Sequence, residues 1–268
     1  MGFVRTKEEI ARIQTALSEP RFVNCAMASV DFLTRPATVA HLLPPGLEPT
    51  ANPRVTAMVG RWQSNCVGDF DGGAVYVEAR HKDIVGDYVL AMYMDRDQPI
   101  IYGRELFGEP KKQATTRLFN NATRATGLVE RYGARLIDLE VELGPDHGAS
   151  EGTGVNFNYK AIPATNGKGL EWDAALTAAR FRTVRRVHRE GAGQLSLGSS
   201  MHDPLNELEI VEVLGGRYIE GDLLASAETL AYIKAEDFLP YALGRTDDWS
   251  ALDTEHRPAM PARMAKAS

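Results

Sequence analysis

The sequence predicts an α+β protein whose core is mostly antiparallel β-sheet, folded as a sandwich or a barrel. Two observations lead to this prediction. Short β-type runs recur along most of the chain, separated by Gly and Asp turns, and helical patterns occur only towards its two ends. The 268 residues suit one all-β domain with a large core. We therefore expect a single domain over residues 1–246 and a loose polar tail over 247–268.

The first predicted element is a helix that begins after Thr6. The segment Thr6-Lys7-Glu8-Glu9 fits a capping box, and apolar residues then recur at helical spacing until Pro20 ends the helix. A strand is expected over Cys25–Leu33. A short helix should follow from Pro36 to Leu43, because proline suits a first helical turn and Pro44-Pro45-Gly46 stops it.

Strand patterns dominate the rest of the chain. The final strand pair is expected at Glu207–Val213 and Gly216–Ala225, with a turn at Gly215-Gly216. A last helix should run from Ser226 through Ile233 and continue or restart to Tyr241. The other predicted strands are Val55–Gln63, Ala74–His81, Tyr88–Met94, Ala125–Tyr132, Leu136–Leu143, Val155–Ile162, Leu176–Val187 and Leu195–Leu197.

Composition argues against several classes of function. A net charge of −6 and a pI of about 5.6 do not suit a nucleic-acid partner. The two cysteines form no CxxC motif, which favours a reduced, cytoplasmic setting. The six histidines show no metal-binding spacing, so we expect no metal and no cofactor. No apolar run reaches the ~18 residues of a membrane span, so we expect no membrane partner.

The most informative segment runs from Gly103 to Lys112 and ends in Pro110-Lys111-Lys112. An amine is a nucleophile only without its proton, and a free lysine, with a pKa near ~10.4, is almost all ammonium at neutral pH. An apolar environment or a second nearby cation depresses that pKa. Leu106 and Phe107 could supply the first condition, and the adjacent lysine could supply the second.

The stretch from Gly86 to Lys112 resembles the acetoacetate decarboxylase superfamily. The pieces Asn158-Tyr159-Lys160-Ala161-Ile162-Pro163 and Asp203-Pro204-Leu205-Asn206-Glu207-Leu208 support the resemblance, which spans roughly Phe22 to Leu239. It implies a cone-shaped antiparallel β-barrel with flanking helices in a homo-oligomer. It also implies that Lys111 forms an imine with a substrate carbonyl and that Lys112 is the cation that activates it. This family is the usual example of such activation, so the role of Lys112 is carried over rather than worked out from the residues.

The sequence departs from the decarboxylase pattern at three polar positions. An ungapped alignment places Cys25 where decarboxylases of the family have an arginine, and Ala57 and Gly72 where they have glutamates. A slip of one residue would bring Asp71 into the last position. These losses favour aldolase, dehydratase or retro-aldol chemistry on a 2-oxo acid or an unsaturated ketone. Decarboxylation of a β-keto acid and non-catalytic binding of a small molecule on the same fold are the alternatives.

Further residues are candidates for the same site. Glu109 is a candidate acid/base, with a solvated loop carboxylate as the alternative. Arg104 could bind a substrate carboxylate bidentately or form a structural ion pair. Trp62 could shape the pocket, and Tyr241 could bind substrate or simply pack in the core. The expected partner is therefore a small keto acid or ketone.

Overall fold

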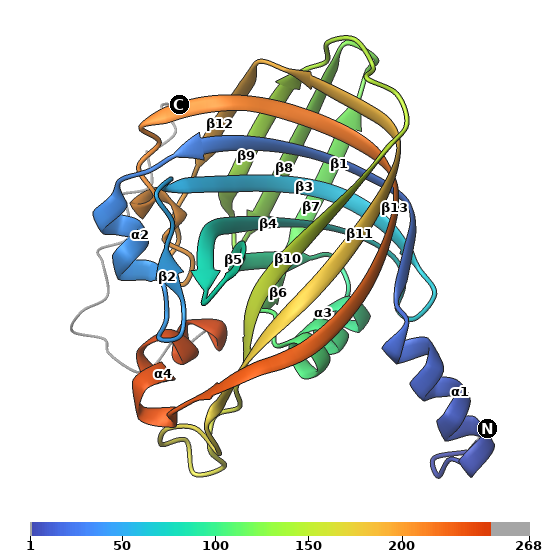
Figure 1. The fold of residues 1–268 in the computed structure, drawn as a ribbon, viewed down its shortest axis with the longest axis vertical. Coiled ribbons are helices and arrows are strands. Elements are labelled where there is room, and N and C mark those ends of the chain that lie inside the picture. The colour runs from blue at the N-terminus through green and yellow to red at the C-terminus, as the bar shows by residue number, and fades with distance from the viewer. Residues whose placement is uncertain (1, 248–268) are drawn as a thin grey trace, which may run out of the picture.

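The fold is built mostly of strands, and a closed β-barrel positions the candidate site. A computed structural model describes residues 2–247. Seven strands form the barrel in the order β4-β3-β1-β13-β11-β10-β5, and the pairing of β4 with β5 closes it. Neighbouring barrel strands are antiparallel except β10 and β5, which are parallel at Asn156 and Phe157. The predicted α+β class and mostly antiparallel barrel are confirmed, with this one parallel step (Figure 1).

The element bounds agree with most of the predicted runs. The helices are α1 (Lys7–Ser18), α2 (Pro36–Leu42), α3 (Asp97–Tyr102), the π-helical turn η1 (Gly103–Phe107), η2 (Leu205–Glu207), α4 (Ala235–Ala242) and η3 (Leu243–Arg245). The strands are β1 (Arg21–Leu33), β2 (Glu48–Pro49), β3 (Arg54–Ser64), β4 (Gly68–His81), β5 (Ile84–Met94), β6 (Lys111–Gln113), β7 (Thr115–Asn120), β8 (Arg124–Arg131), β9 (Ala134–Glu142), β10 (Ser150–Lys160), β11 (Ala174–Gly191), β12 (Gly193–Leu197) and β13 (Glu212–Ile233).

A second sheet covers part of the barrel. Its strands lie in the order β12-β9-β8-β7. Alternate residues of a strand face opposite sides of a sheet. On β3, Val55, Ala57 and Val59 therefore face the main core, which also holds Leu139 and Val129 of the second sheet. The intervening residues of β3 face the interior of the barrel.

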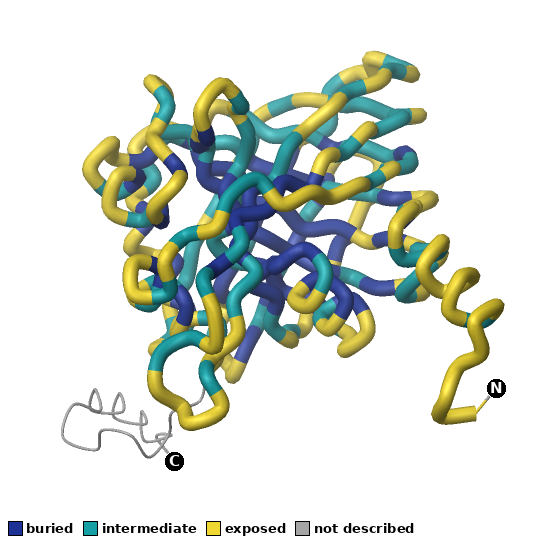
Figure 2. Tube along the Cα trace, turned by 60° about the horizontal axis from the view of Figure 1, so that its bottom comes forward, coloured by how far each residue is buried: buried dark blue, intermediate teal, exposed yellow. Residues whose placement is uncertain are grey.

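Helices occupy the margins of the barrel. The predicted capping box of α1 is present, because Thr6 accepts a hydrogen bond from the Glu9 amide and the Glu9 carboxylate accepts one from the Thr6 amide. No residue of α1 is buried, and Figures 1 and 2 show this helix projecting from the barrel. In the part of the chain that the structure describes, no helix is long and apolar enough to cross a membrane.

Two predictions near the C-terminus are wrong. Residues 212–233 form the single strand β13, so there is no turn at Gly215-Gly216. Gly215 instead lies at a shift of register, where Asp31 pairs with Gly215 and Phe32 pairs with Val213. The predicted helix from Ser226 to Ile233 is also strand. Its alanines and leucines favour a helix, but pairing with β11 supplies the backbone partners and outweighs that preference.

The region between β5 and β8 holds elements that the sequence did not predict. Strands β6 and β7 are short, and α3 and η1 have too few residues to show a clear helical period. The single-domain boundary at residue 246 stays a prediction. The predicted tail, apart from Asp247, lies outside the described residues.

Candidate active site

The interior of the barrel is a cavity of about 260 Å³ that contains the side chain of Lys111. Each of the seven barrel strands contributes at least one residue to its wall, so the cavity is the lumen of the barrel. Lys111 reaches it from β6, which pairs in parallel with β5 beside Met92. Lys111 is only 6% exposed. The lysine singled out from the sequence is therefore buried in the wall of this cavity.

Two glycines allow the chain to deliver Lys111 to this position. Gly108 has φ of +81°, and a Cβ there would lie 2.5 Å from the amide nitrogen of Lys160. Only glycine tolerates both conditions, so Gly108 lets the chain turn from η1 into Glu109 and β6. A Cβ on Gly103 would overlap the carboxylate of Glu109 and lie 2.7 Å from Nζ of Lys111. The π-helical turn thus passes directly against the pair.

Glu109 and Lys111 form a buried ion pair. Nζ of Lys111 lies 2.7 Å from Oε2 of Glu109, and the two side chains are 8% and 6% exposed. This contact lacks the alignment of a hydrogen bond, because Oε2 has no hydrogen-bond partner among the described residues. A carboxylate at this distance can accept or return a proton of the amine. The alternative of a solvated loop carboxylate for Glu109 does not fit its burial.

Apolar side chains surround the pair. The cavity wall includes Met58, Met92 and Met94, and Trp62 stacks on Phe70 with ring centroids 5.3 Å apart. Methionine is flexible and polarizable, so this wall can adapt to an apolar substrate segment. The predicted position of Trp62 at the pocket is consistent with this geometry.

The contacts of Lys112 do not fit the activating role expected from the sequence. Neighbouring residues of a strand point to opposite faces, so Lys112 points out of the barrel while Lys111 points in. Nζ of Lys112 donates to Oδ1 of Asp203 at 2.8 Å and to the His202 carbonyl at 3.0 Å. The ammonium of Lys112 is therefore compensated by a carboxylate on the other face of β6.

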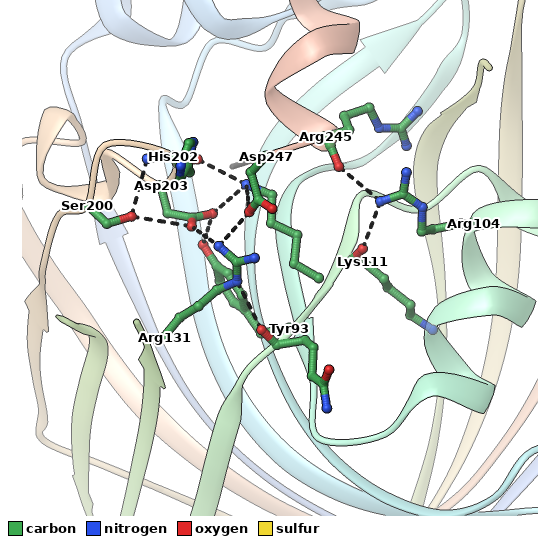
Figure 3. A network of polar contacts seen from close by, with 11 residues as sticks. Tyr93, Arg104, Lys111, Arg131, Ser200, His202, Asp203, Arg245 and Asp247 are labelled. Atoms are coloured by element: carbon green, nitrogen blue, oxygen red, sulfur yellow. Dashed lines mark hydrogen bonds and ion pairs between the residues drawn. The ribbon is translucent and has the colours of Figure 1, made fainter. Parts of the chain in front are cut away.

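A buried polar cluster holds Lys112 in this orientation. Arg131 contacts Asp203 at 3.2 Å and Asp247 at 2.5 Å, and Tyr93 donates to Asp203 at 3.0 Å. Burial, together with the charge of Asp203, raises the pKa of Tyr93 well above its ordinary value. Burial would raise the pKa of Asp247, but the hydrogen bond and charge of Arg131 outweigh it and keep that pKa low. Figure 3 shows Lys111 pointing away from this cluster.

Arg104 and Tyr241 lie away from the lysine cavity. The guanidinium of Arg104 donates to the carbonyls of Lys111 and Arg245, so it braces β6 against the C-terminal segment. Both hydrogen bonds come from Nη1, so the proposal that Arg104 binds a substrate carboxylate stays a prediction. Tyr241 lines a separate hollow of about 410 Å³ that also contains Lys112. Arg245 lines the same hollow, and burial lowers the pKa of its guanidinium to about 10.

Cys25, Ala57 and Gly72 stand at the three positions of the missing decarboxylase residues, and each has different neighbours. Cys25 packs with Met58 and Trp62, and burial raises the pKa of its thiol to about 12. Ala57 faces the main core, and its neighbour Met58 occupies the cavity wall on β3. The residue of β3 that faces the cavity beside Ala57 is therefore also apolar. A Cβ on Gly72 would meet the sulfur of Met94.

The sequence predicted none of the polar residues that line the cavity besides Glu109 and Lys111. Among them, Tyr76, Asp87 and Arg217 line the lumen from three different strands. Burial raises the pKa of Tyr76, with further contributions from Glu109 and Asp87, so its hydroxyl keeps its proton at neutral pH. Tyr76 and Arg217 lay within predicted strands and Asp87 lay one residue before one, but only the sheet register brings them together. The alternation of residues along each strand was the only sequence signal available, and it does not identify which face of a strand lines the lumen.

Comparison with known proteins assigns the family. Residues 9–233 match the family model described as Acetoacetate decarboxylase (ADC). The chain belongs to the acetoacetate decarboxylase family. A member of the family, the acetoacetate decarboxylase of Burkholderia ambifaria (strain MC40-6), is 26% identical over 229 residues, which cover 79% of this chain and 88% of the relative.

Solved structures of the acetoacetate decarboxylase family share the fold. Acetoacetate decarboxylase from Legionella pneumophila has a TM-score of 0.72 and 23% identity, covering 80% of this chain and 87% of that chain. The enduracididine biosynthesis enzyme MppR, complexed with the condensation product of pyruvate and imidazole 4-carboxaldehyde, has a TM-score of 0.68 and 17% identity. That match covers 80% of this chain and 89% of MppR. The fold is therefore shared between proteins that differ in their named substrates.

Proposed function

We propose that this protein is a lyase in which Lys111 forms an imine with the carbonyl carbon of a ketone or 2-oxo acid. The observation that carries the proposal is the placement of a buried amine in a largely apolar lumen, with Glu109 at 2.7 Å. Lys111 attacks as the neutral amine, and Glu109 can accept the proton that the amine gives up.

The chemistry follows from the imine. The amine adds to the carbonyl, water leaves, and the resulting iminium carbon withdraws electrons from its neighbour. Loss of a proton from that neighbour gives an enamine. The enamine can attack an aldehyde to form a new carbon–carbon bond, and elimination of water then gives an unsaturated product. The reverse sequence is a retro-aldol cleavage.

Two residues are suited to move the protons. Glu109 touches the amine and can accept the proton released when the carbinolamine forms. Tyr76 keeps its proton because its pKa is raised, so it can donate to an alkoxide formed in the lumen. This pair would replace the carboxylates and arginine that decarboxylases of the family carry.

Borohydride trapping tests the proposal. The protein is incubated with pyruvate, acetoacetate or acetone and with borohydride, and its intact mass and tryptic peptides are measured. We expect a reduced adduct on the peptide containing Lys111. Lys111→Met should abolish the adduct, and Lys168→Met, which removes an exposed lysine in a turn, should not. A protein that gives no adduct with any of these carbonyl compounds would be a non-catalytic binder, and the proposal would fail.

Decarboxylation of a β-keto acid is the second candidate. It is favoured by the relatives, which are named acetoacetate decarboxylase at 25–27% identity. It is disfavoured by the apolar wall next to Lys111, where Met58 stands on β3. Measuring CO₂ release from acetoacetate beside aldehyde-dependent product formation from pyruvate separates the two reactions.

We further propose that the enzyme is a cytoplasmic homo-oligomer without a cofactor. Size-exclusion chromatography with light scattering tests the assembly.

A further inference from the structure

The lumen has a second, polar end that the proposed reaction does not use. Ser29, Thr56, Asp87, Asn156 and Arg217 line this end, which we call the polar end. Both Asp87 and Arg217 carry charge, and the other members can donate and accept hydrogen bonds. An enzyme that bound only acetone-sized ketones would have no use for such a group of side chains inside its barrel.

The strand register places Ser29 and Arg217, two members of the polar end, across the lumen from Lys111. One row of paired residues runs around the wall through Lys111, Met92, Ala74, Met58, Ser29 and Arg217. Its last member lies on β13, which is as far from β5 as a closed ring of seven strands allows. The side chains of Lys111 and Arg217 both point into the space between them. A bound molecule of several carbon atoms can therefore contact both ends.

The charges around the polar end do not favour a carboxylate. Arg217 is already paired with Asp31 at 3.2 Å, and Arg54 is paired with Asp87 at 3.0 Å and Glu78 at 2.8 Å. Both guanidinium groups therefore already have carboxylate partners. At the other end of the lumen, Lys111 is matched by Glu109. The carboxylate of an anionic substrate would find no unpaired cation among these groups.

Some hydrogen-bonding atoms at the polar end remain available to a bound molecule. Nε of Arg217 donates to Ser29 at 3.1 Å, and one oxygen of Asp87 accepts from Arg54. A carboxylate has two acceptor oxygens, so the second oxygen of Asp87 can accept a hydrogen bond from a bound group.

We propose that the polar end binds an uncharged, hydroxyl-bearing group, so that the substrate is a neutral hydroxylated ketone or aldehyde rather than a keto acid. This inference rests on the proposed imine chemistry and narrows its substrate class. A hydroxyl group both donates and accepts, so it can donate to Asp87 and accept from Asn156 or Arg217. Because it is uncharged, it adds no net charge to the polar end. Apolar carbons between the two functional groups would lie against the methionine wall.

Competition trapping with three matched probes tests this inference. 2-Pentanone, 5-hydroxy-2-pentanone and 4-oxopentanoate share a methyl ketone and differ in the group that reaches the polar end. With borohydride, we expect the hydroxy ketone to trap Lys111 about tenfold faster than 2-pentanone, because a hydrogen bond to a charged partner is worth at least this factor. 4-Oxopentanoate should be the slowest of the three.

Variants assign the effect to the polar end. Asp87→Asn and Asn156→Ala should each lower the ratio of the trapping rates of the hydroxy ketone and 2-pentanone from about ten towards one. Glu151→Gln, at an exposed carboxylate paired with Arg182, is the matched control and should change neither rate. Fastest trapping of 4-oxopentanoate, with loss of that preference in Arg217→Met, would overturn the inference but leave imine formation intact. No adduct with any probe would refute imine formation itself.

Discussion

The substitution Lys112→Met separates two explanations of why adjacent lysines occur in this site. If Lys112 activates Lys111, its removal should abolish imine trapping and leave stability nearly unchanged. If Lys112 belongs to the cluster on the outer face of β6, its removal should lower stability and spare trapping. The ion pair of Lys112 with Asp203, at 2.8 Å, favours the second result.

The expected loss of stability in Lys112→Met follows from the charges in the cluster. Lys112 and Asp203 have side chains that are 9% and 3% exposed, and Arg131 and Asp247 complete a balanced set of two cations and two carboxylates. Removing one partner of a buried pair typically costs 3–5 kcal/mol, and the remaining contact of Arg131 with Asp203 places the expected cost near ~3 kcal/mol. In a protein of this size that corresponds to a fall in Tm of roughly 6–12 °C.

Urea denaturation and borohydride trapping, run on the same preparations, measure the two quantities. Lys112→Arg keeps the charge and should retain most of the stability. The double variant Lys112→Met with Asp203→Asn should lose less than the sum of the two single losses, because it removes both charges of one pair. A Lys112→Met protein within ~0.5 kcal/mol of wild type that no longer traps a ketone would refute the assignment of Lys112 to the outer cluster.

Three other substitutions or measurements probe single features of the lumen. Gly103→Ala should cost ~1–3 kcal/mol and abolish trapping, since its Cβ would displace Glu109 and Lys111. Gly244→Ala, where nothing lies within 4 Å of a Cβ, is its control, and equal trapping by both would contradict this geometry. Cys25, with a pKa of about 12, should resist iodoacetamide at about pH 8 until urea unfolds the protein, and rapid native labelling would be evidence against its burial. Burial raises the pKa of Asp87, so its stabilising contribution is complete at acid pH and is lost as the pH rises through the folded value. The stability of Asp87→Asn relative to wild type should therefore improve between about pH 4 and pH 7, and an unchanged or falling difference would contradict the raised pKa.

The sequence alone was sufficient for the fold class, the family and the nucleophile candidate. Alternation of apolar and polar residues is local, so the strands over residues 54–64 and 124–131 were predicted close to their observed bounds. The capping box at Thr6 depends on four consecutive residues and was predicted correctly. The residues ending in Pro110-Lys111-Lys112 carried the family resemblance, which the family match confirms.

Tertiary structure decided which side chains share the lumen. Adjacent lysines look equivalent in sequence, yet strand geometry sends Lys111 inward and Lys112 outward to Asp203, a residue 91 positions away in the chain. Asp87 and Arg217 meet in one cavity only because the barrel closes between strands far apart in sequence. Patterns within a strand record which residues share a face, but the partner strands and their register determine whether that face becomes a core, a surface or a binding cavity.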